Sequence, residues 1–129
     1  MARARSSQPT EVELQILGVL WEAGPSTVRQ VYLTLADHKD TGYSSVLKMM
    51  QVMHQKGLLL KDETVRPQLF RATTSRTETQ LQMLNDMTQK VFHGSAMRLV
   101  MRMVSSGQLT TEELEEIKQL ADGRQEEQK

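Results

Sequence analysis

Apolar side chains recur at helical spacing three times in the N-terminal part of the chain, which predicts three short helices. The first starts at Thr10, where Glu13 completes a capping box, and it stops at Gly24 and Pro25. The second starts at Ser26 as N-cap, and the polar DHKDTG segment leads into the third. The expected core stripes are Val12, Ile16, Leu17, Leu20 and Ala23 on the first helix, Val28, Val31, Tyr32 and Leu35 on the second, and Val46, Met49, Met50 and Met53 on the third.

Beyond Gly57 the pattern changes from helical to extended. The runs LLLKDE and QLFRA flank TVRP, which predicts two short strands around a turn. The LLL run alone could equally prolong the preceding helix, and Gly57 as a C-cap is the signal against that alternative. Three helices followed by a two-stranded hairpin is the element order of a winged helix-turn-helix, which we predict for residues 1–74.

From Ser75 onward the pattern is helical again, and polar residues mark each boundary. The signals are a capping box of Ser75 with Glu78, a break at 93–95, a stop at Gly107, and a capping box of Thr110 with Glu113. The final GRQEEQK is expected to be disordered. We therefore predict a mainly α chain with a small β-hairpin, in which residues 75–129 form a helical dimerisation region with a disordered tail.

These C-terminal helices total only about 50 residues, which are too few to bury a sufficient core by themselves. The economical partner is a second copy of the chain, because closed two-fold dimers are the commonest soluble assembly. The alternative is that the helices pack back on the N-terminal half. The residues that we assign to a dimer interface are Leu84, Met87, Val91, Met97, Val100, Met101, Val104, Leu114 and Ile117.

The third helix is apolar on one side and weakly charged on the other. Ser44, Lys48, Gln51 and Gln55 share the side opposite the core stripe. Hydroxyls, amides and an ammonium group are the groups that read base edges in the major groove of DNA. An ordinary solvated face is the simpler interpretation, although such a face usually carries more Glu and Lys. The helix is therefore a candidate for DNA recognition.

Composition narrows the class of protein. With 129 residues, of which 38% are apolar and 25% charged, the chain has the make-up of about one ordinary soluble domain. Its net charge is zero, but the 10 Lys/Arg against 7 Asp/Glu up to residue 76, and the 6 against 9 after it, make the first part slightly basic. The chain shows no secretory h-region and no apolar run of membrane length, which indicates the cytoplasm.

Other chemistries find little support in the sequence. The chain has no cysteine, which excludes disulfides and thiolate sites. Its histidines lack the spacing of metal ligands, so we expect no metal site and no cofactor. The i,i+4 methionine pairs, such as Met97 with Met101, lie on apolar faces and are interpreted as packing. No nucleophile or paired-carboxylate signature occurs, so we do not expect an enzyme.

Segments from both halves of the chain resemble a known family. Three N-terminal segments are similar to those of the penicillinase-repressor (BlaI/MecI/CopY) family: EVELQILGVLWEAGPSTVRQVYLTL, GYSSVLKMMQVMHQKGLL and RATTSRTE. The C-terminal dimerisation region of the same family resembles a fourth segment of this chain, HGSAMRLVMRMVSSGQLTTEELEEIKQLA. The resemblance runs from about Pro9 to Ala121. It implies a homodimeric transcriptional repressor that binds a dyad operator and leaves it when a signal arrives.

The resemblance places the DNA-reading residues on the third helix. Ser44 and Ser45 stand where the family usually has two threonines, whereas Lys48 and Val52 replace a usual Thr and Arg, so the operator is expected to differ. We expect Ser44, Ser45, Lys48 and Gln51 nearest the bases in the major groove. Phosphate contacts are expected from Lys61, Arg66 and Arg71, with further contacts from Arg3 and Arg5.

Two alternatives remain beside this assignment. Lys61 and Arg71 could equally serve surface solubility alone. The same polar helix face could also belong to a winged-helix module that binds a protein and has no direct contact with DNA.

The signal that releases this protein from DNA cannot be assigned from the resemblance to the family. The resemblance implies release by proteolysis in the beta-lactamase branch and by metal binding in the copper branch. The Asn-Phe bond that is cut in the first branch aligns with Arg102 and Met103, and the cysteine cluster of the second is absent. Release by a protease of different specificity at Arg102–Met103, or by a ligand or signalling partner, stays open.

Overall fold

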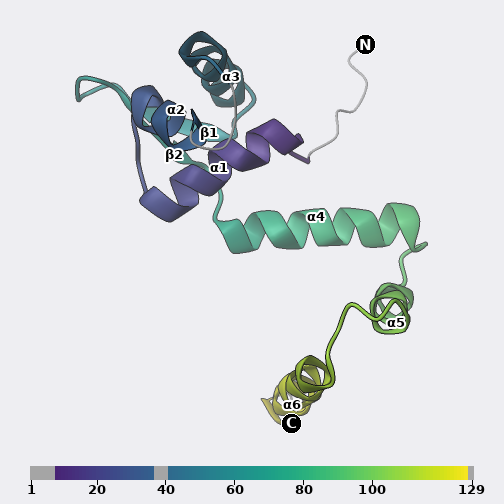
Figure 1. Ribbon diagram of the computed structural model, residues 1–129. Coiled ribbons are helices and arrows are strands. Elements are labelled where there is room, and N and C mark those ends of the chain that lie inside the picture. The colour runs from purple at the N-terminus through teal and green to yellow at the C-terminus, as the bar shows by residue number, and fades with distance from the viewer. Residues whose placement is uncertain (1–7, 37–40, 128–129) are drawn as a thin grey trace. The chain divides into compact units, whose positions relative to one another are not determined.

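The computed structural model describes residues 8–36 and 41–127. Within these residues the chain is mainly helical and includes a two-stranded antiparallel hairpin (Figure 1), as the sequence predicts. The elements are α1 (Glu11–Ala23), α2 (Val28–Ala36), α3 (Tyr43–Gln55), β1 (Leu59–Asp62), β2 (Leu69–Ala72), α4 (Arg76–Val91), α5 (Ala96–Ser105) and α6 (Thr111–Glu127).

The boundaries of α1 follow its local signals. The hydroxyl of Thr10 accepts the N–H of Glu13 at 3.2 Å, and the Glu13 carboxylate accepts the N–H of Thr10 at 2.9 Å, so the predicted capping box is confirmed. At the other end the N–H of Gly24 donates to the carbonyl of Leu20 at 2.8 Å. Gly24 has a φ of 83°, a conformation that a residue with a Cβ rarely adopts.

The core stripe of α1 is shorter than predicted. Ile16, Leu17 and Leu20 are buried, whereas Val12 and Ala23 at the two ends are exposed. The prediction for Val12 is wrong because the first turn of α1 points Glu13 inward instead, where its carboxylate finds hydrogen-bond donors.

The start of α2 corrects another prediction. The capping residue is Thr27, whose hydroxyl accepts the N–H of Gln30 at 3.1 Å while the Gln30 side chain accepts the N–H of Thr27 at 2.7 Å. Ser26 does not cap the helix. Its backbone instead forms an antiparallel bridge to Phe70, with N···O distances of 2.9 and 2.8 Å. Ser26 therefore joins the chain before α2 to the hairpin.

Gly57 ends α3 and turns the chain into the hairpin. Its φ of 88° lies in the left-handed region, and the following N–H, of Leu58, donates to the carbonyl of Met53 at 2.9 Å. The LLL run consequently enters β1 and does not prolong α3. β1 and β2 pair in a register that runs from Leu59 opposite Ala72 to Asp62 opposite Leu69.

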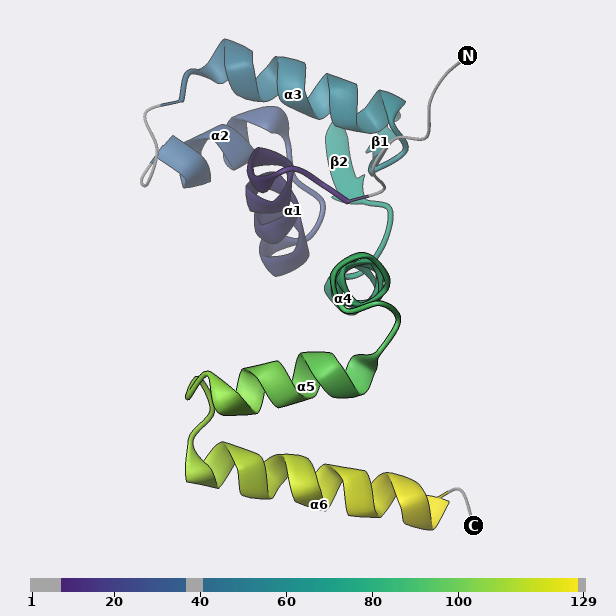
Figure 2. The ribbon, with the colours of Figure 1, turned by 90° about the vertical axis from the view of Figure 1, so that its right-hand side faces the viewer.

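The first three helices and the hairpin enclose one apolar core. Figure 2 shows α3 lying along α2 and reaching the hairpin, in agreement with the packing of α3 against both α2 and β1. This arrangement is a winged helix, as predicted. The buried apolar side chains are Ile16, Leu17, Leu20, Val28, Val31, Val46, Met50, Met53, Leu59 and Phe70.

The helices after the hairpin also begin at their predicted signals. Ser75 with Glu78 and Thr110 with Glu113 form reciprocal hydrogen bonds of 2.9–3.0 Å, and the hydroxyl of Ser95 caps α5 through the N–H of Arg98. The disordered tail that we predicted from Gly123 is wrong as far as Glu127, because α6 continues to that residue. Arg, Gln and Glu are good helix formers, and a single glycine costs a helix only about 1 kcal/mol.

The chain divides into two compact units, Met1–Met83 (unit 1) and Leu84–Lys129 (unit 2). The division falls inside α4, so the first turns of α4 belong with the winged helix and not with the helices after it. Unit 2 differs from unit 1 in burial. Among its described side chains only Thr88 is buried, and no apolar side chain is.

Candidate nucleic-acid interface

The polar side of α3 is exposed to solvent. Ser44, Ser45, Lys48, Gln51 and Gln55 are all exposed, while Val46, Met50 and Met53 on the other side are buried. Among the residues that the structure describes, Lys48 has no acidic partner. The helix therefore presents hydroxyl, amide and ammonium groups together on one exposed face, the arrangement expected from the sequence.

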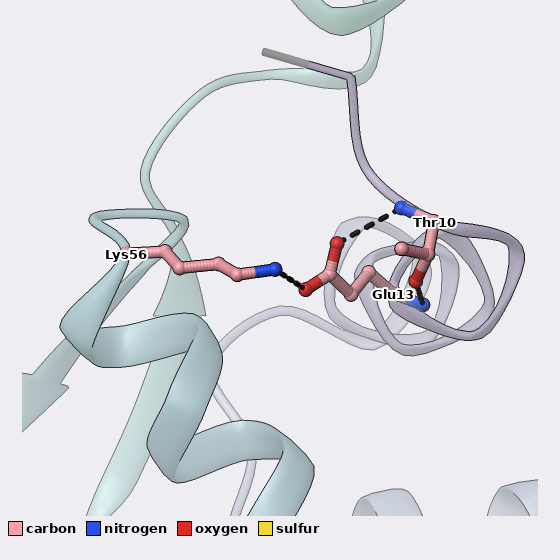
Figure 3. A network of polar contacts seen from close by, with 3 residues as sticks. All are labelled: Thr10, Glu13 and Lys56. Atoms are coloured by element: carbon pink, nitrogen blue, oxygen red, sulfur yellow. Dashed lines mark hydrogen bonds and ion pairs between the residues drawn. The ribbon is translucent and has the colours of Figure 1, made fainter. Parts of the chain in front are cut away.

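An ion pair fixes the C-terminal end of α3 against the start of α1. Lys56, which caps α3, donates to the carboxylate of Glu13 at 2.7 Å, and the same carboxylate accepts the N–H of Thr10 (Figure 3). The side chain of Glu13 is 2% exposed and that of Lys56 36%. The sequence pattern identifies Glu13 as a capping residue but gives no sign of its second partner, Lys56, which lies 43 positions away.

Burial would raise the pKa of Glu13, but its partners outweigh this effect. The hydrogen bonds from Lys56 and Thr10, together with the positive charge of Lys56, hold the pKa of Glu13 below its ordinary value of 4.5. A carboxyl group with a lowered pKa in the folded state stabilises the fold at pH values above its ordinary pKa. That contribution is lost as the pH falls through the folded pKa, because the protonated group no longer attracts Lys56.

Replacing Glu13 with Gln is expected to lower the free energy of unfolding at pH 7 by about 1–2 kcal/mol, since a hydrogen bond between charged groups becomes a weaker one and Lys56 is partly solvated. The loss of stability as the pH falls below 4.5 should also become shallower. Urea unfolding between pH 7 and pH 3 measures both effects.

Glu63→Gln is the matched control, because the Glu63 side chain is 62% exposed and lies 3.7 Å from Lys61. Equal pH profiles for the natural chain and Glu13→Gln would contradict the expected role of Glu13.

The hairpin separates two residues that the sequence analysis grouped together. Lys61 stands opposite Phe70 in the register, and Leu60 stands opposite Arg71. Because successive residues of a strand point to opposite faces, Lys61 and Arg71 lie on different faces of the hairpin. The ammonium of Lys61 also lies 6.0 Å from the centre of the Phe70 ring. Arg71 is exposed, so the two residues have different surroundings.

Arg66 lies in the exposed turn between the two strands. Asp62 accepts both the N–H of Thr64, at 2.9 Å, and the Thr64 hydroxyl, at 2.6 Å. These hydrogen bonds hold the pKa of Asp62 below its ordinary value. Asp62 therefore stays ionised and orders the start of the turn.

The residues assigned to a dimer interface are all exposed in the single chain. Their exposed fractions run from 36% for Leu114 to 68% for Met97. The full set is Leu84, Met87, Val91, Met97, Val100, Met101, Val104, Leu114 and Ile117. Arg102 and Met103 lie near the end of α5 and are exposed as well.

The described histidines do not gather with acidic residues into a metal site. His54 packs edge-on against Phe70, with 6.5 Å between the ring centres. Within residues 8–36 and 41–127, no group of three or more His, Asp or Glu lies close enough to hold a metal ion. Over the same ranges, no helix has the length and apolar character that crossing a membrane requires. Arg3, Arg5 and His38 lie outside the described residues.

The chain was compared with known proteins. The model of one family, described as penicillinase repressor, matches residues 9–123. A comparison with curated proteins found no match. The family match covers the winged helix as well as α4, α5 and most of α6, so both halves of the chain contribute to it. The chain therefore belongs to the penicillinase repressor family, a family of transcriptional repressors.

Proposed function

We propose that the protein is a homodimeric repressor that binds a dyad operator in double-stranded DNA. The observation that carries the proposal is the exposed polar face of α3 on a helix whose other face is buried in the winged-helix core. A helix of this kind can enter the major groove of DNA without disturbing its own packing. The pair of Glu13 and Lys56 supports the proposal, because it holds α3 in place from its C-terminal end.

In this proposal the N-terminal part of α3, as far as Gln51, reads bases. Ser44, Ser45, Lys48 and Gln51 reach base edges, and Gln55 extends the same polar row toward the end of the helix. Arg66 in the hairpin turn and Arg71 on β2 are assigned to phosphates in this proposal, where they fix position and do not read sequence. Lys61 is the weakest of these candidates, since its side chain is only 22% exposed and has Glu63 as a neighbour.

Unit 2 supplies the dimer contact in this proposal. Apolar residues at helical spacing are exposed on α4, α5 and α6, and no described apolar side chain of unit 2 is buried. Monomeric soluble proteins rarely leave a large contiguous apolar surface uncovered. A second copy that covers the same residues by two-fold symmetry would remove this surface from water.

The proposal is tested by titrating the protein against fragments of genomic DNA at several salt concentrations. A repressor should select particular fragments, and its affinity should fall steeply as salt rises, because Lys and Arg displace counterions from phosphates. A winged-helix module that binds only a protein partner would show no salt-dependent binding to any fragment.

Lys48→Ala and Arg66→Ala are expected to behave differently on DNA. Loss of a base contact at Lys48 should cost about 1–3 kcal/mol on the best operator and change the preference among operator sequences. Loss of a phosphate contact at Arg66 should weaken all sequences about equally and lower the salt slope by about one unit. Binding curves on a panel of operator variants measure both effects.

Lys90→Ala is the control for both variants, since Lys90 lies in unit 2 and pairs with Asp86 on the surface. It should leave affinity and salt slope unchanged. If Lys48→Ala lowers the affinity for every sequence by the same factor, Lys48 contacts phosphate, and base reading then falls to Ser44, Ser45 and Gln51.

A further inference from the structure

Two residues near the end of α1 contact the segment that leads into α4. The indole N–H of Trp21 donates to the carbonyl of Thr74 at 2.9 Å, across 53 positions of sequence. Arg76, the first residue of α4, lies over the Trp21 ring with 5.8 Å between the guanidinium carbon and the ring centre. Its guanidinium also donates to the carboxylate of Glu22 at 3.2 Å. Two consecutive residues of α1 therefore hold two positions at the start of α4.

The entry to α4 is held from its own side as well. The hydroxyl of Thr74 lies 2.9 Å from that of Thr79, a residue that is 4% exposed. Ser75 and Glu78 close the capping box of α4 around the same turn. Thr74 is thus fixed through both its carbonyl and its hydroxyl. We call this cluster of Trp21, Glu22, Thr74, Arg76 and Thr79 the α4 joint, and all of it lies within unit 1.

We infer that the α4 joint sets the distance between operator half-sites that the dimer accepts. The inference rests on the proposed function, in which each winged helix binds one half-site and unit 2 joins the two copies. α4 is one continuous helix that begins at the joint and reaches into unit 2. Its direction at the joint therefore limits where the second winged helix can lie, in addition to any limit from unit 2 itself.

Changing the number of base pairs between the two half-sites of an operator measures how strictly the dimer requires one distance. Each base pair added between two half-sites moves them apart by about 3.4 Å and rotates one against the other by roughly 34°, because a helical turn holds about 10–10.5 base pairs. A dimer with stiff connections cannot follow this change and loses the advantage of binding both half-sites at once. A dimer with a loosened joint follows it more easily.

Two substitutions loosen the joint without touching the polar face of α3. Trp21→Phe keeps an aromatic ring beneath Arg76 and removes the N–H that binds Thr74. Arg76→Met keeps an unbranched chain over the ring and removes the ion pair with Glu22. Thr34→Ala is the control, because Thr34 is exposed on α2 and its hydroxyl bonds only the carbonyl of Gln30, one turn away.

The test begins with a dyad that the natural full-length chain selects from random DNA, followed by versions with one base pair added or removed at its centre. The natural chain and Thr34→Ala should lose about tenfold or more in affinity on the altered dyads. Trp21→Phe and Arg76→Met should lose less than about threefold, while their affinity for an isolated half-site stays that of the natural chain. Sedimentation and circular dichroism establish that each variant is folded and dimeric.

The outcomes separate this inference from the proposed function. If the variants reject altered dyads as strongly as the natural chain does, or if the natural chain itself tolerates them, the joint does not set the spacing, although the protein still binds operators. If the natural chain selects no sequence at all, the proposed function fails and the inference fails with it. Should Trp21→Phe not fold, Arg76→Met alone decides, because the ion pair with Glu22 that it removes is on the surface.

Discussion

A chain that ends at Met83 is expected to be monomeric and to bind the operator about 10²- to 10⁴-fold more weakly than the full chain. The shortened chain keeps the whole buried apolar core, which runs from Ile16 to Phe70, together with the contacts of Trp21 and Arg76. It lacks every residue assigned to the dimer interface. Each winged helix would then bind its half-site independently, without the high effective concentration that a bound partner provides.

Sedimentation measures the first part of this prediction and operator titration the second. Trp21 is the only tryptophan of the chain, so its emission reports whether unit 1 is intact in the shortened chain. As a control, an unrelated dimeric coiled coil appended after Met83 should restore a large part of the lost affinity. If the chain ending at Met83 sediments as a dimer, the interface lies in unit 1 and the role assigned to unit 2 is wrong.

The local signals of the sequence located most of the elements correctly. A capping box involves residues only three positions apart, so the boxes at Thr10, Ser75 and Thr110 could be recognised without any knowledge of the fold. Ser26 was misassigned because a long-range contact decided its role. Its backbone bonds Phe70, and the cap passes to Thr27, whose partner Gln30 was a valid local signal.

The candidate site was predictable only where helical spacing defines it. The exposed polar row on α3 can be predicted from the spacing of the apolar residues on the same helix. In the structure these polar residues are exposed, as expected. The separation of Lys61 from Arg71 depends on the strand register, which the sequence pattern left undetermined. The ion pair between Glu13 and Lys56 depends on how α1 packs near the end of α3. The spacing of residues within either helix does not predict it.

The position of Arg102 and Met103 bears on how the protein is released from DNA. Arg102 and Met103 are neighbours in α5, a helix of 10 residues with no buried side chain. An isolated helix of fewer than about 12–15 residues is marginally stable, so we expect this segment of a single chain to open readily to a protease. Packing against a second copy would protect it. The bond would therefore be most accessible in whatever fraction of the protein is monomeric.

Cleavage between Arg102 and Met103 is expected to vacate the operator without damage to the winged helix. The N-terminal product keeps unit 1 but loses Met103, Val104 and the whole of α6, which carries Leu114 and Ile117. A chain that ends at Arg102 should therefore sediment mainly as a monomer and bind the operator about 10²- to 10⁴-fold more weakly than the full chain. Its circular dichroism and Trp21 emission should show an intact unit 1.

Whether cells use this route is decided by the intact mass of the protein recovered after its target genes have been derepressed. A fragment that ends at Arg102 would identify cleavage as the signal. Full-length protein that has left its operator would exclude cleavage and point to a ligand or a partner protein. If instead the chain ending at Arg102 remains a dimer and keeps its affinity, cutting this bond cannot release the operator at all, because α4 and the first turns of α5 would suffice to hold the two copies together.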